Sequence, residues 1–434
     1  MSDVKAPASL VEQFFFVKIK NSWQFFKAES FAFKCVCLYL FVEYFRPQAI
    51  FPFLDFIPWA QVFLTGAFLA AFSDPKAKFR MDPMHIYVLL FSLAVHASFL
   101  VAYSIEWSQR YYIFFIQWIV IYFLICWIVT TRERFFIFFL ILFFCALKIA
   151  AGTARIWVMR GFSFTQWGLM GPQGYFQNSG ELAVLMVVLF PLAIYLYVDH
   201  KNSCKTWEKW ILIAGFVCPI LTILGSSSRG SQVALALQLI FLFWRKIFNL
   251  KVLLSVAVLT YGVLTLLPDE QKERFTSIGE DKSSLQRTLY WKNGWEMMKE
   301  HPFLGVGFYN FIPYYNVHYP NDRLYGTAQL PHNIFVQVGT DAGFTGLLFY
   351  MAIIALALTR RLKVKLDETE PDELLLLSIW KGLRLGIFGF AIAGQFVTIG
   401  YYPFLWISIA FQTSLFLIIN NRIADRGKRN AVRR

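Results

Sequence analysis

Residues 111–130 read YYIFFIQWIVIYFLICWIVT, a run of apolar and aromatic residues without a single charged side chain. About 20 such residues cross the hydrocarbon core of a bilayer as one helix. Of the 434 residues, 57% are hydrophobic and 16% are charged, whereas ordinary soluble domains have roughly 45–50% and about 25%. This pattern excludes a water-soluble enzyme and predicts an all-α integral membrane protein with about twelve transmembrane helices. The expected spans lie near residues 31–45, 56–73, 84–104, 111–130, 135–152, 178–198, 208–224, 230–244, 247–267, 333–358, 383–399 and 401–420.

Lysine and arginine collect in alternate connections between these spans, and basic connections of this kind face the cytoplasm. They include Lys76, Lys78, Arg80, Arg132, Arg134, Lys201, Lys205, Lys209, Arg245, Lys246, Lys251, Arg360, Arg361, Lys363 and Lys365. The net charge of +14 comes largely from these basic connections. We therefore attribute it to the orientation of a membrane protein and expect no nucleic-acid partner. Both termini are expected in the cytoplasm.

The same reading divides the chain into five parts. Residues 1–30 form an interfacial segment, 31–267 carry the first nine helices, 268–331 form one long external loop, 332–420 carry the last three helices, and 421–434 form a basic tail. The six cysteines lie in apolar runs or in a cytoplasmic connection, which indicates no external disulfide framework.

The short external connections contain arginine but no lysine. Guanidinium groups form bidentate hydrogen bonds to phosphate oxygens, so these arginines suit an anion at the membrane edge, with interfacial anchoring as the alternative. Arg229 follows Gly225-Ser226-Ser227-Ser228 and precedes an apolar run, which predicts a helix N-terminus that favours phosphate. Arg155 and Arg160 lie in an aromatic connection over 153–177, which fits head-group contact and an aromatic belt equally well.

Two features of the long loop indicate chemistry. A helix is expected near residues 283–300 and carries Arg287. His332 follows Pro331 and precedes a long apolar run, so it should lie at a helix N-terminus, where the dipole keeps imidazole neutral. A neutral imidazole can act as a general base, although an isolated histidine at such a junction is more often structural.

The motif around His332 favours the role of general base over a structural role. His332-Asn333, nine residues, and Gly343-Phe344-Thr345-Gly346 resemble the His-Asn-x9-Gly-x-x-Gly pattern of the bacterial O-antigen ligase and O-antigen polymerase superfamily. The Ser228-Arg229-Gly230 helix start and the pair Arg287 and Trp291 resemble that family too. The likeness is strongest over residues 150–350, and the first 150 residues fit by topology alone.

The resemblance implies a glycosyltransferase in the bacterial inner membrane, with a periplasmic active site and an undecaprenyl-diphosphate-linked glycan as donor. It implies that His332 is the base, that Arg229, Arg287, Arg155 and Arg160 bind the diphosphate, and that Asn333, Gly343 and Gly346 support the site. The acceptor is the lipid A core in a ligase and a second lipid-linked glycan in an O-antigen or exopolysaccharide polymerase. The motif favours a ligase, although protein O-oligosaccharyltransferases share the same region.

The chemistry of the residues agrees with this interpretation. Fixed arginines stabilise a diphosphate leaving group, and the external segments hold no Asp-x-Asp motif or His/Cys cluster, so an inverting enzyme without metal or cofactor is expected. A flippase or transporter is the rival class, and such proteins place ionisable residues near the midplane, often in repeated halves. Here the ionisable residues lie near the outer face and no repeat is visible, which favours an enzyme.

Overall fold

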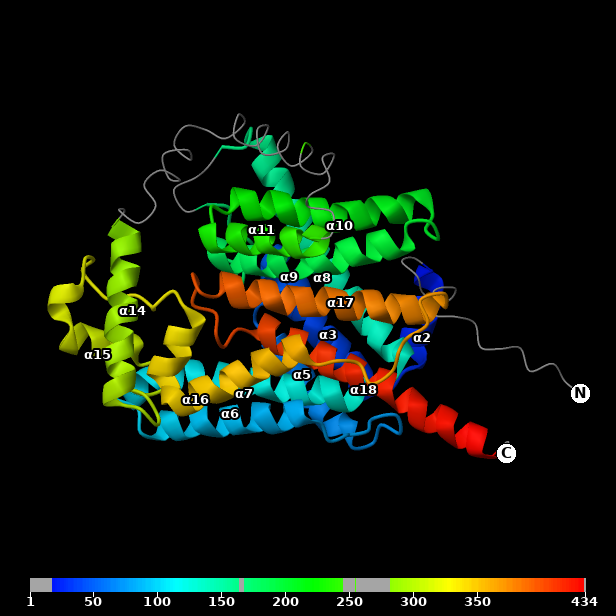
Figure 1. Ribbon diagram of the computed structural model, residues 1–434, viewed down its shortest axis with the longest axis horizontal. Helices are drawn as coiled ribbons and strands as arrows, with labels where there is room; N and C mark the ends of the chain where they lie inside the picture. Colours follow the sequence, from blue (N-terminus) through cyan, green and yellow to red (C-terminus); the bar gives the residue numbers. More distant parts are fainter. Residues whose placement is uncertain (1–17, 164–167, 245–253, 255–281, 433–434) are drawn as a thin grey trace, which may run out of the picture.

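The computed structural model describes residues 18–163, 168–244, 254 and 282–432, and every regular element in these ranges is a helix (Figure 1). The predicted all-α class is therefore confirmed. The first elements are α2 (Ile19–Ala28), α3 (Phe31–Phe45), α4 (Pro47–Ile50), η1 (Pro52–Leu54), α5 (Trp59–Ala71), α6 (Pro83–Leu100), α7 (Ile105–Ile128) and α8 (Arg132–Met159). They are followed by α9 (Ser179–His200), α10 (Thr206–Gly225), α11 (Arg229–Phe243), α14 (Lys282–Glu300), α15 (Phe311–His318), η3 (Pro320–Asp322), α16 (Ile334–Thr359), α17 (Pro371–Ala393) and α18 (Pro403–Val432).

Eight of the described helices are long and apolar enough to cross a membrane, namely α6 to α10 and α16 to α18. The helices α5 and α11 are apolar but shorter, and α3 has 15 residues. The predicted span over 247–267 lies outside the described residues. A multi-pass membrane protein is thus established, and the number of about twelve spans stays a prediction.

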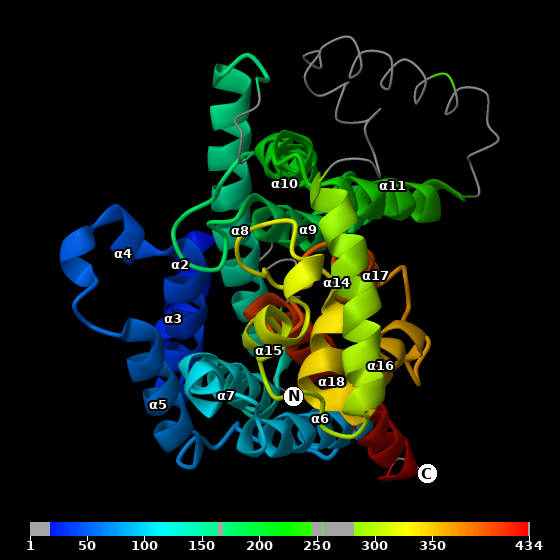
Figure 2. The same cartoon turned by 90° about the vertical axis from the view of Figure 1, so that its left-hand side faces the viewer.

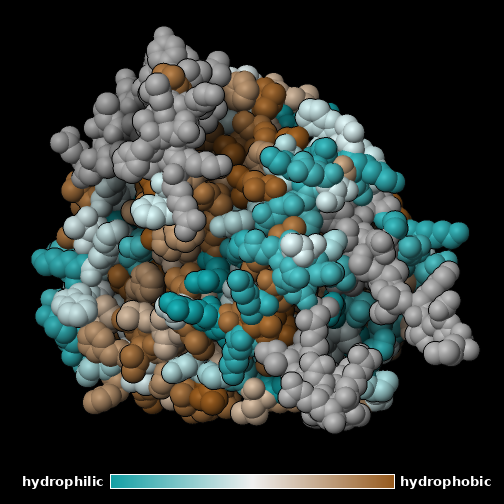
Figure 3. All heavy atoms as spheres, turned by 45° about the vertical axis from the view of Figure 1, so that its right-hand side comes forward, coloured by the Kyte–Doolittle hydropathy of each residue, from teal (hydrophilic) through white to brown (hydrophobic). Residues whose placement is uncertain are grey.

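The helices run between two chemically different ends of the bundle. At one end, drawn on the right of Figure 1, lie α2 and the end of α18, and ion pairs join Glu29 to Lys76 and Arg134. At the other end α14 and α15 cover the bundle, and Figure 2 looks onto this end. Figure 3 brings the first end forward and shows hydrophilic side chains gathered there, with hydrophobic side chains around them. The end of the bundle with Lys76 and Arg134 thus lies opposite the end that α14 and α15 cover.

Two predicted boundaries were wrong. Residues 153–159 continue α8 instead of joining an external connection, because the Thr153 hydroxyl is satisfied by Thr222 Oγ1 at 2.9 Å and Trp157 packs on Gly225 of α10. The predicted span 383–399 is instead α17, which begins at Pro371. Proline suits the first turn of a helix, where its missing N–H has no helical partner to lose.

Three predicted elements were confirmed. The helix expected near 283–300 is α14, the apolar run after Ser228 begins α11 at Arg229, and the run after His332 forms α16. Within the segment 1–30 that was expected at the interface, residues Ile19–Ala28 form the helix α2, while residues 1–17 lie outside the described residues.

Candidate active site

His332 lies on a short loop whose backbone is held by two separate elements. The indole N–H of Trp291 on α14 donates to the carbonyl of Pro331 at 2.9 Å. The backbone N–H of His332 donates to Thr398 Oγ1 at 2.8 Å, and that of Ile334 donates to the carbonyl of Gly394 at 2.8 Å. His332 itself has a φ of 51°, in the left-handed region that a non-glycine residue adopts only when its surroundings hold it there.

Asn333 begins the helix that follows the histidine. Its side chain accepts hydrogen bonds from the backbone N–H groups of Phe335 at 2.9 Å and Val336 at 3.2 Å, which satisfies two donors at the start of α16. The histidine therefore lies just outside a helix N-terminus, as its sequence position predicted. The motif's asparagine has a structural task here, which is to fix where the helix starts.

The imidazole of His332 is half-buried and neutral. Burial, together with the positive charge of Arg287, lowers the pKa of His332 from 6.5 to about 4. Arg287 is also half-buried and lies one helical turn before Trp291 on α14. One helix thus supplies both a cation beside the imidazole and a hydrogen bond to the loop that carries it.

The glycines of the motif allow a loop to lie against α16. Gly343 has a φ of 67° at a kink in the helix, and a Cβ there would lie 2.5 Å from the backbone of Phe303. The N–H of Phe344 donates to the carbonyl of Pro302 at 2.8 Å. A Cβ at Gly346 would lie 2.4 Å from Ala342, so both glycines serve the packing at this kink.

Arg229 is the first residue of α11 and is half-buried. The turn before it, Ser226 to Ser228, packs against Gly168, where a Cβ would lie 2.4 Å from the carbonyl oxygen of Ser226. A Cβ at the next residue, Gly230, would lie 2.6 Å from the side chain of Phe396. Arg229 therefore lies at a helix N-terminus that contacts the connection between α17 and α18.

That connection, residues 394–402, is the part of the site that sequence reasoning missed. Thr398 and Gly394 accept from the His332 loop, and Phe396 lies against Gly230 beside Arg229. Val397 lies 3.1 Å from the Cβ position of Gly180, at the start of α9. The connection therefore touches the N-termini of α9, α11 and α16. Its composition, without a charged residue or histidine, gave no signal.

The structure does not place Arg155 and Arg160 with His332. Both are exposed at the end of α8, and Arg160 is its C-cap. Trp157, between them, packs on Gly225, four residues before Arg229, so these arginines lie on the flank of the Arg229 turn. Figure 2 shows this end of α8 extending beyond the neighbouring helices.

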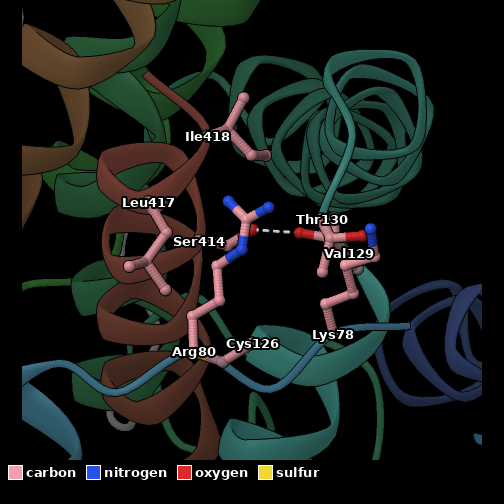
Figure 4. Close-up of a pocket in the computed structure, with 8 residues that line it drawn as sticks. All are labelled: Lys78, Arg80, Cys126, Val129, Thr130, Ser414, Leu417 and Ile418. Carbon is pink, nitrogen blue, oxygen red and sulfur yellow. Dashed lines mark hydrogen bonds between the residues drawn. The ribbon is translucent and has the colours of Figure 1, made fainter. Parts of the chain in front are cut away.

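A small pocket occupies the opposite end of the bundle. It is lined by Lys78, Arg80, Cys126, Val129, Thr130, Ser414, Leu417 and Ile418 (Figure 4). It lies at the far end of α7 from Ser104, whose N–H bonds to Asn310 at 2.7 Å in the loop-covered end. The pocket is thus separate from the histidine. Within residues 18–163, 168–244 and 282–432, no three His, Cys, Asp or Glu side chains gather as metal ligands.

Apolar helices that cross a membrane, with a neutral histidine beside an arginine at one end, define a multi-pass membrane protein with a one-sided polar site. Residues 214–351 match the family model described as O-antigen ligase, and this segment contains Arg229, Arg287 and the whole His332 motif. A domain of the O-antigen ligase family therefore occupies residues 214–351, and it supports the resemblance to the O-antigen ligase and polymerase superfamily that the motif predicted.

Members of this family are enzymes of the glycosyltransferase type, and their substrates are glycans linked to lipids. Residues 17–201 match a second model, described as a family of unknown function. The comparison with curated proteins gives no match. The family assignment therefore comes from the segment that also holds the histidine.

Proposed function

We propose that the protein transfers a glycan from undecaprenyl diphosphate to a sugar hydroxyl of the lipid A core. The reaction takes place at the periplasmic face of the bacterial inner membrane, with residues 268–331 as the periplasmic loop and both termini in the cytoplasm. The observation that carries this proposal is the neutral, half-buried imidazole of His332 beside Arg287, in the segment that matches the O-antigen ligase family.

In the proposed reaction His332 takes the proton from the acceptor hydroxyl. The acceptor oxygen then bonds to the anomeric carbon while the bond from that carbon to the diphosphate oxygen breaks on the opposite face, which inverts the configuration. Undecaprenyl diphosphate leaves, and the imidazolium returns its proton to water. The low pKa of His332 keeps the base neutral before each turnover.

The leaving diphosphate gains negative charge, and we assign its stabilisation to arginines in place of a metal ion. Arg229 is suited to this task because it begins a helix, where the dipole and free N–H groups favour an anion. Arg287 adds a second charge beside His332. Arg155 and Arg160 are exposed on the flank of the Arg229 turn, and we assign them contact with the donor head group at the bilayer edge.

The test is a reconstitution of the purified protein in liposomes with undecaprenyl-diphosphate oligosaccharide, with and without lipid A core, in the presence of EDTA. Glycan that appears only on supplied core supports a ligase. Activity that EDTA abolishes and magnesium restores contradicts the metal-free mechanism. Wild-type turnover by a folded His332→Ala variant contradicts the role of the base.

A polymerase is the second candidate, because the matched family includes both activities. The same reconstitution separates the two. A ladder of longer glycans on the lipid carrier, formed without core, identifies a polymerase and leaves His332 with the same chemistry on a different acceptor.

A further inference from the structure

We propose that Thr398 is a positioning residue of this transferase, and that the 394–402 connection sets the distance between His332 and Arg229. The inference rests on the proposed roles of those two residues. It adds a requirement that the motif does not contain, since Thr398 lies 66 positions after His332 along the chain.

The first observation is how the connection holds the histidine loop. Three of its residues bond to the start of α16: Thr398 to the His332 N–H at 2.8 Å, Gly394 to the Ile334 N–H at 2.8 Å, and Gly400 through its own N–H to Gln337 Oε1 at 3.0 Å. The first N–H groups of a helix lack helical partners, so the connection satisfies donors that the helix cannot. The left-handed conformation of His332 is unfavourable for any residue but glycine, and Thr398 accepts its hydrogen bond from the backbone N–H of that same residue.

The second observation is that the same connection touches the arginine side of the site. Phe396 lies against Gly230, the residue after Arg229, at a point where even a methyl group does not fit. The other end of the connection is fixed to α9, because the hydroxyl of Tyr402 donates to Glu181 Oε1 at 2.7 Å. The connection is therefore fixed at both ends and touches α11 and α16 within three residues, Phe396 to Thr398.

Group transfer depends on the distance between the base and the leaving group. A misplacement of about 1 Å can lower a rate by about 10²-fold. Phe396 lies against the start of α11 beside Arg229, and Thr398 bonds to His332 two residues further along, so a shift in this segment moves one residue relative to the other. The expected defect lies in the chemical step, while the arginines that bind the donor stay in place.

Thr398→Val keeps the shape of the side chain and removes the acceptor for the His332 N–H. We expect kcat to fall by at least about 10-fold, with the KM for undecaprenyl-diphosphate oligosaccharide within about 2-fold of wild type, because the loop that carries His332 loses the bond that holds the base in place. Thr398→Ser retains the hydroxyl and should restore kcat to within about 3-fold. The matched control is Ser408→Ala, which removes a buried hydroxyl that bonds Phe404 within α18 at 2.7 Å.

Gly230→Ala tests the other side of the same segment. Its Cβ would meet Phe396 at 2.6 Å and push the connection away from α11, so kcat should fall again. Gly152→Ala on α8 is the control, because nothing lies within 4 Å of that Cβ position. This pair also serves if Thr398→Val fails to accumulate in the membrane.

The outcomes separate the two proposals when His332→Ala is measured in the same assay. An active His332→Ala protein overturns the role of His332 as the base, whereas a wild-type protein that transfers no glycan overturns the proposed function itself. If His332→Ala is inactive while Thr398→Val and Gly230→Ala turn over like wild type, the base assignment stands and the positioning role is wrong. Equal losses in the valine and serine variants, or losses matched by lower unfolding temperatures, show a structural role and also overturn it.

Discussion

The indole N–H of Trp291 donates to the carbonyl oxygen of Pro331 at 2.9 Å, one residue before His332. Trp291 belongs to α14 in the loop region, whereas Pro331 belongs to the segment that leads into α16. Arg287 lies one turn earlier on α14 and lowers the pKa of the same histidine. Helix α14 therefore acts on His332 in two ways: Trp291 holds the backbone of the loop that carries it, and the charge of Arg287 lowers its pKa.

This relationship leads to the first prediction. Trp291→Phe keeps an aromatic ring and removes the N–H, so the Pro331 carbonyl loses its partner. A neutral hydrogen bond contributes about 1 kcal/mol net, and kcat should fall about 5-fold at saturating donor. Trp207→Phe is the control, because Trp207 is exposed near the start of α10 at the opposite end of the bundle. Equal kcat values in both variants would show that the contact does not serve catalysis.

The second prediction concerns pH. A general base acts in its neutral form, and burial with the charge of Arg287 lowers the pKa of His332 from 6.5 to about 4. The rate should therefore stay level from pH 8 to about 5.5 and fall only as the pH approaches the lowered pKa. Rates of wild-type protein in liposomes, measured across this range with stability checked at each pH, give the acid limb.

Arg287→Gln provides the matched comparison for this limb. Loss of the positive charge should raise the pKa of His332 and move the acid limb to higher pH, while burial still holds it below 6.5. The rate should also fall at every pH, because the proposed diphosphate contact is lost. A wild-type limb centred near 6.5 would contradict a buried, neutral base.

The third prediction separates phosphate binding from anchoring. Arg229→Lys keeps the charge and loses the planar fork that grips phosphate. We expect a loss of about 10- to 100-fold in kcat/KM, the equivalent of about 1.5–3 kcal/mol for a charge-assisted hydrogen bond. Arg110→Lys is the control, since Arg110 is exposed and its guanidinium lies over Trp107 at 5.3 Å. Unchanged kinetics in Arg229→Lys would return Arg229 to a simple anchor.

Much of the fold could be predicted because lipid demands long apolar runs. The run predicted over 333–358 is α16 at Ile334–Thr359, and the proline before His332 correctly placed the histidine at a helix start. Polar residues caused the errors. Thr153 and its neighbours looked too polar for a span, yet the Thr153 hydroxyl finds a partner on α10, so the helix continues.

The contacts of the site were harder to predict than its charged residues. Histidine and arginine are candidate site residues by their type alone, and the motif places His332 and Gly343 in one continuous segment of sequence. Thr398 meets His332 only because α17 packs along α9 and returns its end to α16. A threonine in an uncharged turn carries no local signal for such a contact, so single-sequence reasoning cannot find it.

The fourth prediction tests which face of the membrane holds the site. Thr327→Cys places a thiol on the exposed loop before His332, and Ser203→Cys places one on the exposed α9–α10 connection. A membrane-impermeant maleimide should label the first variant in intact spheroplasts and the second only after lysis. The parent protein is the control, since five of its cysteines are buried and Cys218 is half-buried. The reverse pattern would invert the proposed topology.

The fifth prediction concerns stability at the other end of the bundle. Arg134 is fully buried and bonds to Glu29 at 2.6 Å and to Asp74 at 2.7 Å. Burial alone would raise the pKa values of both carboxyls, but the bonds from Arg134, with Lys76 on Glu29, lower them below 4.5 and 3.8. Arg134→Met leaves two buried carboxylates short of a cation and should cost about 3–5 kcal/mol, seen as a lower unfolding temperature in detergent, with the activity per folded molecule unchanged.

Because a lowered carboxyl pKa stabilises the fold only while the group is ionised, the difference in stability between Arg134→Met and wild type should shrink as the pH falls below 3.8. Arg132→Gln, which removes a 3.9 Å pair with Asp372, should change the unfolding temperature little, and equal shifts in the two variants would contradict a special role for the buried cluster.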